Sequence, residues 1–151
     1  MASKLYKKIL IATDGSEYTK RAVEYGIDLA KSTDAKLYAI YVIDTAAFAS
    51  IPMDAAWESM YELLKQEGDE ATKSVADKAA AEGLDVERLT IEGHPAEEIS
   101  KYAEKNSVDL IVMGTLGKSG LDRFLLGSVA EKVVRTSKIA VLVVRGKNKQ
   151  K

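Results

Sequence analysis

Two polar clusters in this sequence could bind an anionic ligand through backbone groups. Thr13-Asp14-Gly15-Ser16 follows a short apolar run, and a glycine-rich segment, GTLGKSGLDRFLLGSV, occupies Gly114–Val129. Glycine lets a backbone approach a ligand closely and adopt conformations that side chains forbid. Both clusters lead towards the start of a helix, where N–H groups without a partner favour an anion. We therefore interpret the second segment as a phosphate-binding loop that continues into a helix.

The glycine-rich segment does not fit two familiar nucleotide-binding patterns. A Walker A loop needs Gly-x-x-x-x-Gly-Lys-Ser/Thr, but Val112 stands five residues before Gly117, so the first glycine is missing. The dinucleotide pattern G-x-G-x-x-G fails after the first apolar run, where only Gly15 occurs. The backbone groups that could hold a phosphate, which we call the cradle, therefore come from the two ends of the segment, and the first half contains Gly114 and Gly117.

The second half of this cradle is Gly127-Ser128, directly before the helical VAEKVVR. Ser128 is expected to cap that helix and to offer its hydroxyl to a phosphate. Lys118 and Arg123, in the intervening loop, could neutralise phosphate charge. The alternatives are that the glycines serve only as turn residues and that Lys118 is an ordinary exposed lysine. Asp14 likewise fits either a ligand contact or a turn residue in Asp-Gly-Ser.

Apolar runs that predict strands alternate with helical patterns along the whole chain. The runs are Ile9–Thr13, Lys36–Ile43, Leu84–Ile91, Asp109–Met113 and Ile139–Val144. Continuous apolar strands are typical of a parallel sheet covered by helices on both faces. Leu84–Ile91 is more mixed and alternating, as expected near a sheet edge. The order βαβαβαβαβ, with right-handed crossovers, predicts one doubly wound α/β domain.

Four helices are expected between these runs. One follows a cap at Ser16, one begins at His94-Pro95 with proline in its first position, and one covers Ser128–Arg135. The longest carries an apolar stripe of core side chains that includes Trp57, Met60, Tyr61, Leu64, Ala71, Val75 and Ala79, and Gly83 ends it.

Composition and charge exclude several classes of protein. The 151 residues are 46% hydrophobic and 30% charged, with a formal net charge of −1, so bulk attraction to nucleic acid or anionic lipid is not expected. There is no cysteine, which fits a reducing cytoplasm, and no apolar segment approaches the length of a membrane span. His94 is the only histidine, so it is expected to be a loop residue and neither a metal ligand nor a general base.

The spacing Gly114-x2-Gly117-x9-Gly127-Ser128, with an aspartate just past the first strand, resembles the ATP-binding branch of the universal stress protein family. The similarity runs through KKILIATDGS, YVID, GHPAEEI, DLIVMGTLGKSG, LLGSVAEKVV and IAVLVVR, almost the full chain. Many family members carry Ser-His or Ser-Arg after the first glycine, where this chain has Thr115-Leu116. That difference removes a polar side chain near the nucleotide but leaves the backbone cradle intact.

The resemblance implies a fold and a set of binding residues. We expect a Rossmann-like, adenine nucleotide alpha hydrolase-like domain over residues 1–146, with five parallel strands in the order 3-2-1-4-5, and a basic tail over residues 147–151. The base and ribose would lie against Ala12, Thr13, Asp14 and Val42, and the ribose side would meet Met113 and Gly114. The phosphates would be held by Gly117, Lys118, Gly127, Ser128 and Val129. Mg²⁺ or Mn²⁺ would ride on the phosphates of ATP, ADP or AMP with few protein ligands, and no protein residue is assigned to a metal.

The family is typically a homodimer through its last strand. Ile139–Val144 agrees with this expectation, because an apolar edge strand usually finds a partner. Three functions stay open: a cytoplasmic nucleotide-dependent stress or signalling switch, a slow metal-dependent ATPase, and a structural dimer without ligand. No arrangement of acid, base and nucleophile identifies a reaction, and Asp14 is the only candidate for a catalytic role. The apolar connection Asp44–Ala56 could be a lid, a partner-facing segment, or a disordered or locally packed loop.

Overall fold

The sheet has five parallel strands in the order β3-β2-β1-β4-β5, which confirms the order that the family resemblance implies. The computed structural model describes residues 5–50, 52, 54–115 and 126–146 of the chain. The strands are β1 Lys8–Ala12, β2 Lys36–Asp44, β3 Val86–Gly93, β4 Leu110–Gly114 and β5 Ala140–Val144. All five agree with the predicted runs to within two residues at each end. The last five residues, predicted to be a tail, lie outside the described residues.

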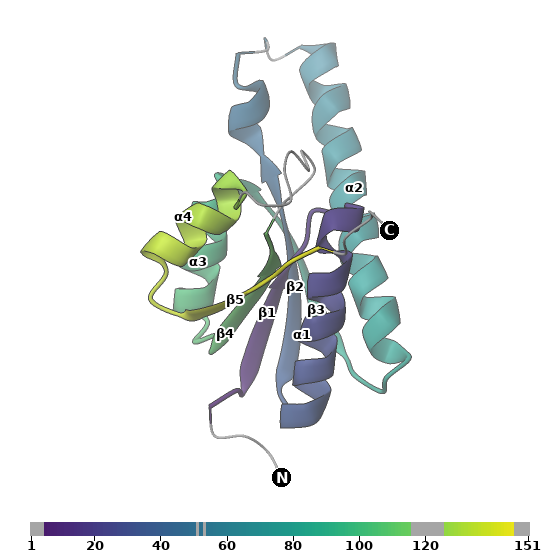
Figure 1. Ribbon diagram of the computed structural model, residues 1–151. Helices are drawn as coiled ribbons and strands as arrows, with labels where there is room; N and C mark the ends of the chain where they lie inside the picture. Colours follow the sequence, from purple (N-terminus) through teal and green to yellow (C-terminus); the bar gives the residue numbers. More distant parts are fainter. Residues whose placement is uncertain (1–4, 51, 53, 116–125, 147–151) are drawn as a thin grey trace, which may run out of the picture.

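Two helices cover each face of the sheet (Figure 1). The helices are α1 Lys20–Thr33, α2 Ala55–Ala80, α3 Pro95–Lys105 and α4 Ser128–Thr136, with 3₁₀ turns η1 Glu17–Thr19 and η2 Thr45–Phe48. Side chains of β1 alternate between two cores: Ile9 and Ile11 pack under α1 and α2, whereas Leu10 packs under α3 and α4. This alternation explains why the central strands read as unbroken apolar runs, since both of their faces are buried.

The helix starts differ from the sequence prediction at one point. Ser16 precedes the 3₁₀ turn η1, its side chain makes no capping hydrogen bond, and α1 begins only at Lys20. The physical reason is that Asp14, rather than Ser16, is the polar side chain that bonds to the backbone here: its carboxylate accepts a hydrogen bond from the Ser16 N–H at 2.9 Å and forms a turn before the helix. The start of α3 at Pro95, after His94, is confirmed.

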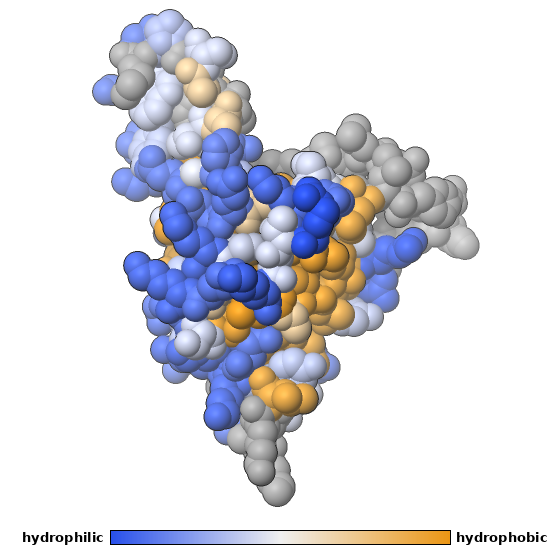
Figure 2. All heavy atoms as spheres, turned by 90° about the vertical axis from the view of Figure 1, so that its left-hand side faces the viewer, coloured by the Kyte–Doolittle hydropathy of each residue, from blue (hydrophilic) through white to orange (hydrophobic). Residues whose placement is uncertain are grey.

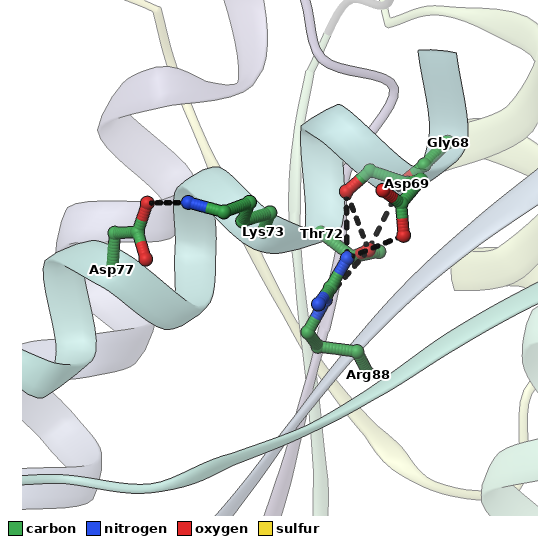
Figure 3. A network of polar contacts seen from close by, with 6 residues as sticks. All are labelled: Gly68, Asp69, Thr72, Lys73, Asp77 and Arg88. Carbon is green, nitrogen blue, oxygen red and sulfur yellow. Dashed lines mark hydrogen bonds and ion pairs between the residues drawn. The ribbon is translucent and has the colours of Figure 1, made fainter. Parts of the chain in front are cut away.

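The two edges of the sheet differ in polarity. On β3 the exposed positions include Glu87, Arg88, Thr90 and Glu92. Arg88 ties this edge to α2: its guanidinium donates to the Asp69 carboxylate at 2.7 Å and to the Thr72 hydroxyl at 3.2 Å (Figure 3).

The other edge, β5, consists only of Ala, Val and Leu, and of its five residues only Val144 is fully buried. Charged side chains on an edge strand discourage pairing with another chain, whereas an apolar edge invites it.

The N-terminal half of α2 rises beyond the end of the sheet (Figure 1). The buried residues of α2 all come from its second half, beginning at Gly68. The expectation of a core stripe is therefore wrong for Met60, which is 39% exposed, while Trp57 and Tyr61 are half-buried and pack against a small cluster that includes Tyr41.

The connection Asp44–Ala56 is partly ordered by local hydrogen bonds. Asp44 ends β2 and accepts from the Ala46 N–H, and Asp54 caps α2 by accepting from the N–H groups of Ala56 and Trp57. No helix in the described residues is long and apolar enough to cross a membrane.

Candidate functional site

A cavity of about 390 Å³ opens at the carboxyl ends of β1, β2 and β4. It lies where the strand order reverses, because the helices that follow β1 and β4 cover opposite faces of the sheet. Ligands of open α/β sheets bind at such a point, and small-molecule pockets span about 300–1,000 Å³. The lining residues are Ala12, Thr13, Asp14, Thr19, Ile40, Tyr41, Val42, Asp44, Leu64, Pro95, Ile99, Met113, Gly114, Thr115, Gly127, Ser128, Val129 and Ala130.

Most of the sequence-predicted binding residues come together in this cavity. The residues that the structure places at the cavity wall come from the ends of β1, β2 and β4 and from the start of α4: Ala12, Thr13, Asp14, Val42, Met113, Gly114, Gly127, Ser128 and Val129. Gly117, Lys118 and Arg123 lie outside the described residues. The chain segments that bear the nine residues are far apart in sequence, so the fold alone brings them to one place.

The turn after β1 is held by hydrogen bonds among its own side chains. The Gly15 N–H donates to the Thr13 hydroxyl at 3.1 Å, and the Thr19 hydroxyl lies 3.4 Å from Asp14 Oδ1 and 3.1 Å from the Ser16 carbonyl oxygen. Gly15 has a φ of +80°, a conformation that favours glycine.

Asp14 is therefore a turn residue, as one of the two sequence interpretations held. Its Oδ1 serves this turn, and no second protein donor reaches its other oxygen among the described residues. Since Asp14 is only half-buried at the cavity wall, that second oxygen can meet a ligand.

The opposite wall is the start of α4. Gly127 occupies the capping position, its N–H donates to the Thr115 carbonyl oxygen at 2.6 Å, and Ser128 is the first helical residue. The expectation that Ser128 caps α4 is thus wrong, because Gly127 already has the extended conformation of a cap. The first N–H groups of α4, those of Ser128 and Val129, have no acceptor within the helix and favour an anion at this end of the cavity.

The described cavity wall carries acidic side chains but no basic one. Asp14 and Asp44 are its only charged residues, and the rest is largely apolar. A polyanionic ligand there would need positive charge from the α4 N-terminus, from a metal ion that it carries, or from residues outside the described part. Within the described residues, no three His, Cys, Asp or Glu side chains form a group that could hold a metal ion.

Sequence reasoning missed several lining residues. Ile40 and Tyr41 adjoin Val42 in β2, and Pro95 belongs to the GHPAEEI motif, so their proximity to predicted residues was the available signal. No sequence pattern marks Leu64 as a lining residue, because its position at the cavity depends on how far α2 extends past the sheet. His94 is exposed and absent from the wall, in agreement with its interpretation as a loop residue.

The chain matches known proteins over nearly its whole length. Residues 5–145 match the model of the Universal stress protein family. Universal stress protein MJ0531 of Methanocaldococcus jannaschii is 49% identical over 146 residues, which cover 97% of this chain and 86% of that protein. Universal stress protein YxiE of Bacillus subtilis is 33% identical over 148 residues, covering 93% of this chain and 100% of that protein.

Solved structures agree with these matches. The structure of hypothetical protein MJ0577 superimposes with a TM-score of 0.81 at 33% identity, covering 96% of this chain and 99% of that one. A universal stress protein solved in complex with cAMP gives a TM-score of 0.70 at 28% identity, with 95% and 100% of the two chains covered.

Proposed function

This chain belongs to the universal stress protein family, and from that premise we propose that it is a cytoplasmic, ATP-binding protein that acts as a nucleotide-dependent stress or signalling switch. The observation that carries the proposal is the split cradle. Its two halves, Gly114 at the end of β4 and Gly127-Ser128 at the start of α4, border one cavity together with the Asp14 turn, and the cavity has a size suited to a nucleotide. The complex of a related family member with cAMP supports an adenine nucleotide as the ligand.

The chemistry of the cavity wall fits the parts of an adenine nucleotide. The apolar side chains of Val42 and Ile99 suit a flat aromatic base, and the Asp14 carboxylate suits the hydroxyl groups of a ribose, whose other side would meet Met113. The N–H groups at the start of α4 suit phosphate oxygens. ATP, ADP and AMP share all three parts, and they differ in how far their phosphates extend towards the segment that contains Gly117 and Lys118.

Bound Mg²⁺ or Mn²⁺ would offset phosphate charge next to the acidic wall. Asp14 and Asp44 leave the described wall negative, so a polyphosphate without a cation would be repelled there. The ion would be held mainly by the phosphates, with few protein ligands.

A switch also needs a connection between the ligand and another surface. The Gly127 N–H donates to the Thr115 carbonyl oxygen at 2.6 Å, and the Thr115 N–H donates to the Val144 carbonyl oxygen at 3.1 Å. Two hydrogen bonds therefore join the phosphate end of the cradle to β5. We expect the binding of a nucleotide to change the position or the hydrogen bonding of β5.

The apolar edge of β5 supports the proposal of a homodimer through Ile139–Val144. Figure 2 views the molecule from the side of α3 and α4 and shows a hydrophobic area across this face. On α4, Val134 is 48% exposed, and Leu126, two residues before α4 begins, is 41% exposed. Pairing of two β5 edges would satisfy the open backbone groups of both strands.

The proposal is tested by identifying what the protein binds. Purified protein is denatured, released nucleotides are identified by mass spectrometry, and emptied protein is titrated with ATP, ADP and AMP in a calorimeter, with and without Mg²⁺. Gly127→Val should weaken binding at least tenfold, because Gly127 lines the cavity directly before the first N–H groups of α4. Gly146→Val is the matched control, since a Cβ there would meet only the Tyr18 carbonyl oxygen at 3.7 Å.

The outcome also separates the three functions. Absence of both co-purified nucleotide and heat of binding would refute the switch and favour a structural dimer. Turnover of ATP by the wild type, lost in Gly127→Val, would favour the slow ATPase.

A further inference from the structure

The free end of α2 carries an apolar strip outside both cores. Met60 and Leu63 are 39% and 60% exposed, and their spacing of three residues places them on one helix face. Single exposed apolar residues are ordinary, but these two adjoin the partly exposed pair Trp57 and Tyr61. Together these four side chains form a nearly continuous apolar surface.

Contacts within the fold hold the aromatic part of this surface and the helix end in place. The rings of Trp57 and Tyr61 are stacked, with centroids 5.5 Å apart and an angle of 4° between their planes. The Tyr61 hydroxyl donates to the Glu92 carboxylate at 2.5 Å, and Asp54 caps the helix end through two hydrogen bonds. A preformed surface loses little conformational entropy when a partner binds.

Acidic residues border the strip. Asp54, Glu58 and Glu62 follow one another at a spacing of four residues, and all three are exposed. Further along α2, Glu67 and Glu70 lie on the same helix face as Leu63, at spacings of four and seven residues. Lys65 is the single basic residue between Asp54 and Glu70.

The acidic residues next to the strip are available to a partner. Glu58 and Glu62 form no ion pair with any described residue. The first ion pair that follows them along α2 joins Asp69 to Arg88, more than one helical turn after Leu63.

We propose that this acid-rimmed surface, formed by Trp57, Glu58, Met60, Tyr61, Glu62 and Leu63, docks a basic amphipathic helix of a partner protein. The apolar strip matches an apolar helix face with residues at spacings of three and four, and the acidic rim matches flanking Lys or Arg side chains. The same rim repels a second copy of itself and repels an anionic lipid surface. The proposal goes beyond nucleotide binding and does not require it.

Two synthetic peptides of about 18 residues serve as probes, a length that gives about five helical turns. In the first peptide, leucines at spacings of three and four residues form one helix face and lysines occupy the other face. In the second peptide, glutamates replace the lysines. Binding is followed by the fluorescence of Trp57, the only tryptophan in the chain. The Leu/Lys peptide should bind more weakly as salt is added, and the Leu/Glu peptide should bind at least tenfold more weakly than the Leu/Lys peptide.

Variants of the surface decide whether the peptide binds there. Leu63→Ser and the double variant Glu58→Lys/Glu62→Lys should each weaken binding of the Leu/Lys peptide at least tenfold. The double variant Glu24→Lys/Asp28→Lys makes the same charge change at the same spacing on exposed positions of α1, and its affinity should stay within twofold of the wild type. Glu58→Gln/Glu62→Gln, which only removes charge, should lie between the two double variants.

Circular dichroism verifies that each variant is folded. Equal loss of affinity in the α1 variant, or unchanged affinity in both surface variants, would overturn the proposal. A change in sedimentation of the protein alone in Leu63→Ser would assign the surface to a second copy of the chain and overturn it as well.

Discussion

The hydroxyl oxygens of Thr13 and Thr19 lie 3.3 Å apart, and both side chains are buried beneath the Asp14 turn. These two residues line the candidate nucleotide cavity and also a second cavity of about 240 Å³ between α1 and α2. The Thr19 hydroxyl has one proton and three oxygen neighbours, in Thr13, Asp14 and Ser16, so it links the end of β1 to the turn that presents Asp14.

Replacement of Thr19 by valine should therefore affect both stability and ligand binding. Thr19→Val keeps the side-chain shape but removes the hydroxyl, which should lower the free energy of unfolding by about 1–2 kcal/mol. Nucleotide affinity should fall as well, because Asp14 Oδ1 loses a neighbour that orients it. Urea unfolding measures the first effect and calorimetric titration the second.

Thr33→Val is the matched control for Thr19→Val. The Thr33 hydroxyl donates only to the Leu29 carbonyl oxygen within α1, far along the chain from the turn. If Thr19→Val lowered stability and left nucleotide affinity at the wild-type value, the orientation of Asp14 would not matter for binding.

The sheet could be predicted because its central strands are buried on both faces, which forces runs such as DLIVM and IAVLVV into the sequence. Helix starts are harder to predict. Asp-Gly-Ser is compatible with a cap at Ser16. However, the hydrogen bond from the Ser16 N–H to Asp14 forms a turn at this point of the chain, and α1 begins only at Lys20. Local composition cannot decide between two such neighbouring polar partners.

The cavity could be predicted where motifs mark it, and less where only tertiary geometry does. Gly114 and Gly127 stand out by their spacing, whereas Leu64 lines the cavity only because α2 extends past the sheet. The same extension exposes Met60, which belongs by periodicity to the buried stripe of α2. Periodicity identifies a face of a helix, but it does not tell where the opposing surface ends.

Gly26 provides a test of packing between α1 and the sheet. A Cβ at this position would lie 2.6 Å from Cγ1 and Cδ1 of Ile11, which is fully buried in β1. Gly26→Ala should gain about 1 kcal/mol of helix propensity and lose about 1–3 kcal/mol to overpacking, so a net loss of stability is expected.

A second substitution separates these two effects. Ile11→Ala removes both Cγ1 and Cδ1, so the double variant Gly26→Ala/Ile11→Ala should be more stable than the sum of the single changes predicts. Thermal or urea unfolding of the four proteins measures the coupling. Additive effects would show that the backbone of α1 shifts and that Ile11 is not the obstacle.

Tyr61 should titrate at higher pH than an ordinary tyrosine. Its hydrogen bond to Glu92, helped by partial desolvation, raises the pKa of Tyr61 above 10.0. The neutral phenol is the form that the folded protein favours, so this contact stabilises the fold below the unfolded pKa. Its contribution is lost as the pH rises through the folded pKa, where the phenolate would face the Glu92 carboxylate.

The pKa of Tyr61 can be measured by the ultraviolet absorbance of the phenolate, as the difference between the wild type and Tyr61→Phe. Glu92→Gln should bring this pKa back towards its ordinary value, because it removes the negative charge that the phenolate would meet. Glu87→Gln, on the same strand, is the control and should leave the Tyr61 difference titration unchanged. A titration of Tyr61 that is the same with and without the Glu92 charge would contradict the contact.

The backbone of β5 allows a test of the proposed homodimer. The Val144 carbonyl oxygen accepts from the Thr115 N–H, next to β4, so the backbone groups of Val144 point into the sheet. Because the N–H and C=O groups of a strand alternate in direction, those of Val141 and Val143 point to the open edge. Val141→Pro should then remove one edge donor and leave the ladder to β4 intact, since proline is tolerated on edge strands.

We expect Val141→Pro to sediment as a monomer at concentrations where the wild type is a dimer. Val141→Ala keeps the N–H group and reduces only the side chain, so it should remain a dimer and thereby separate backbone pairing from apolar contact. Circular dichroism verifies that β5 still folds in both variants. A dimer that persists in Val141→Pro would move the interface away from this edge, and a monomeric wild type would refute the dimer itself.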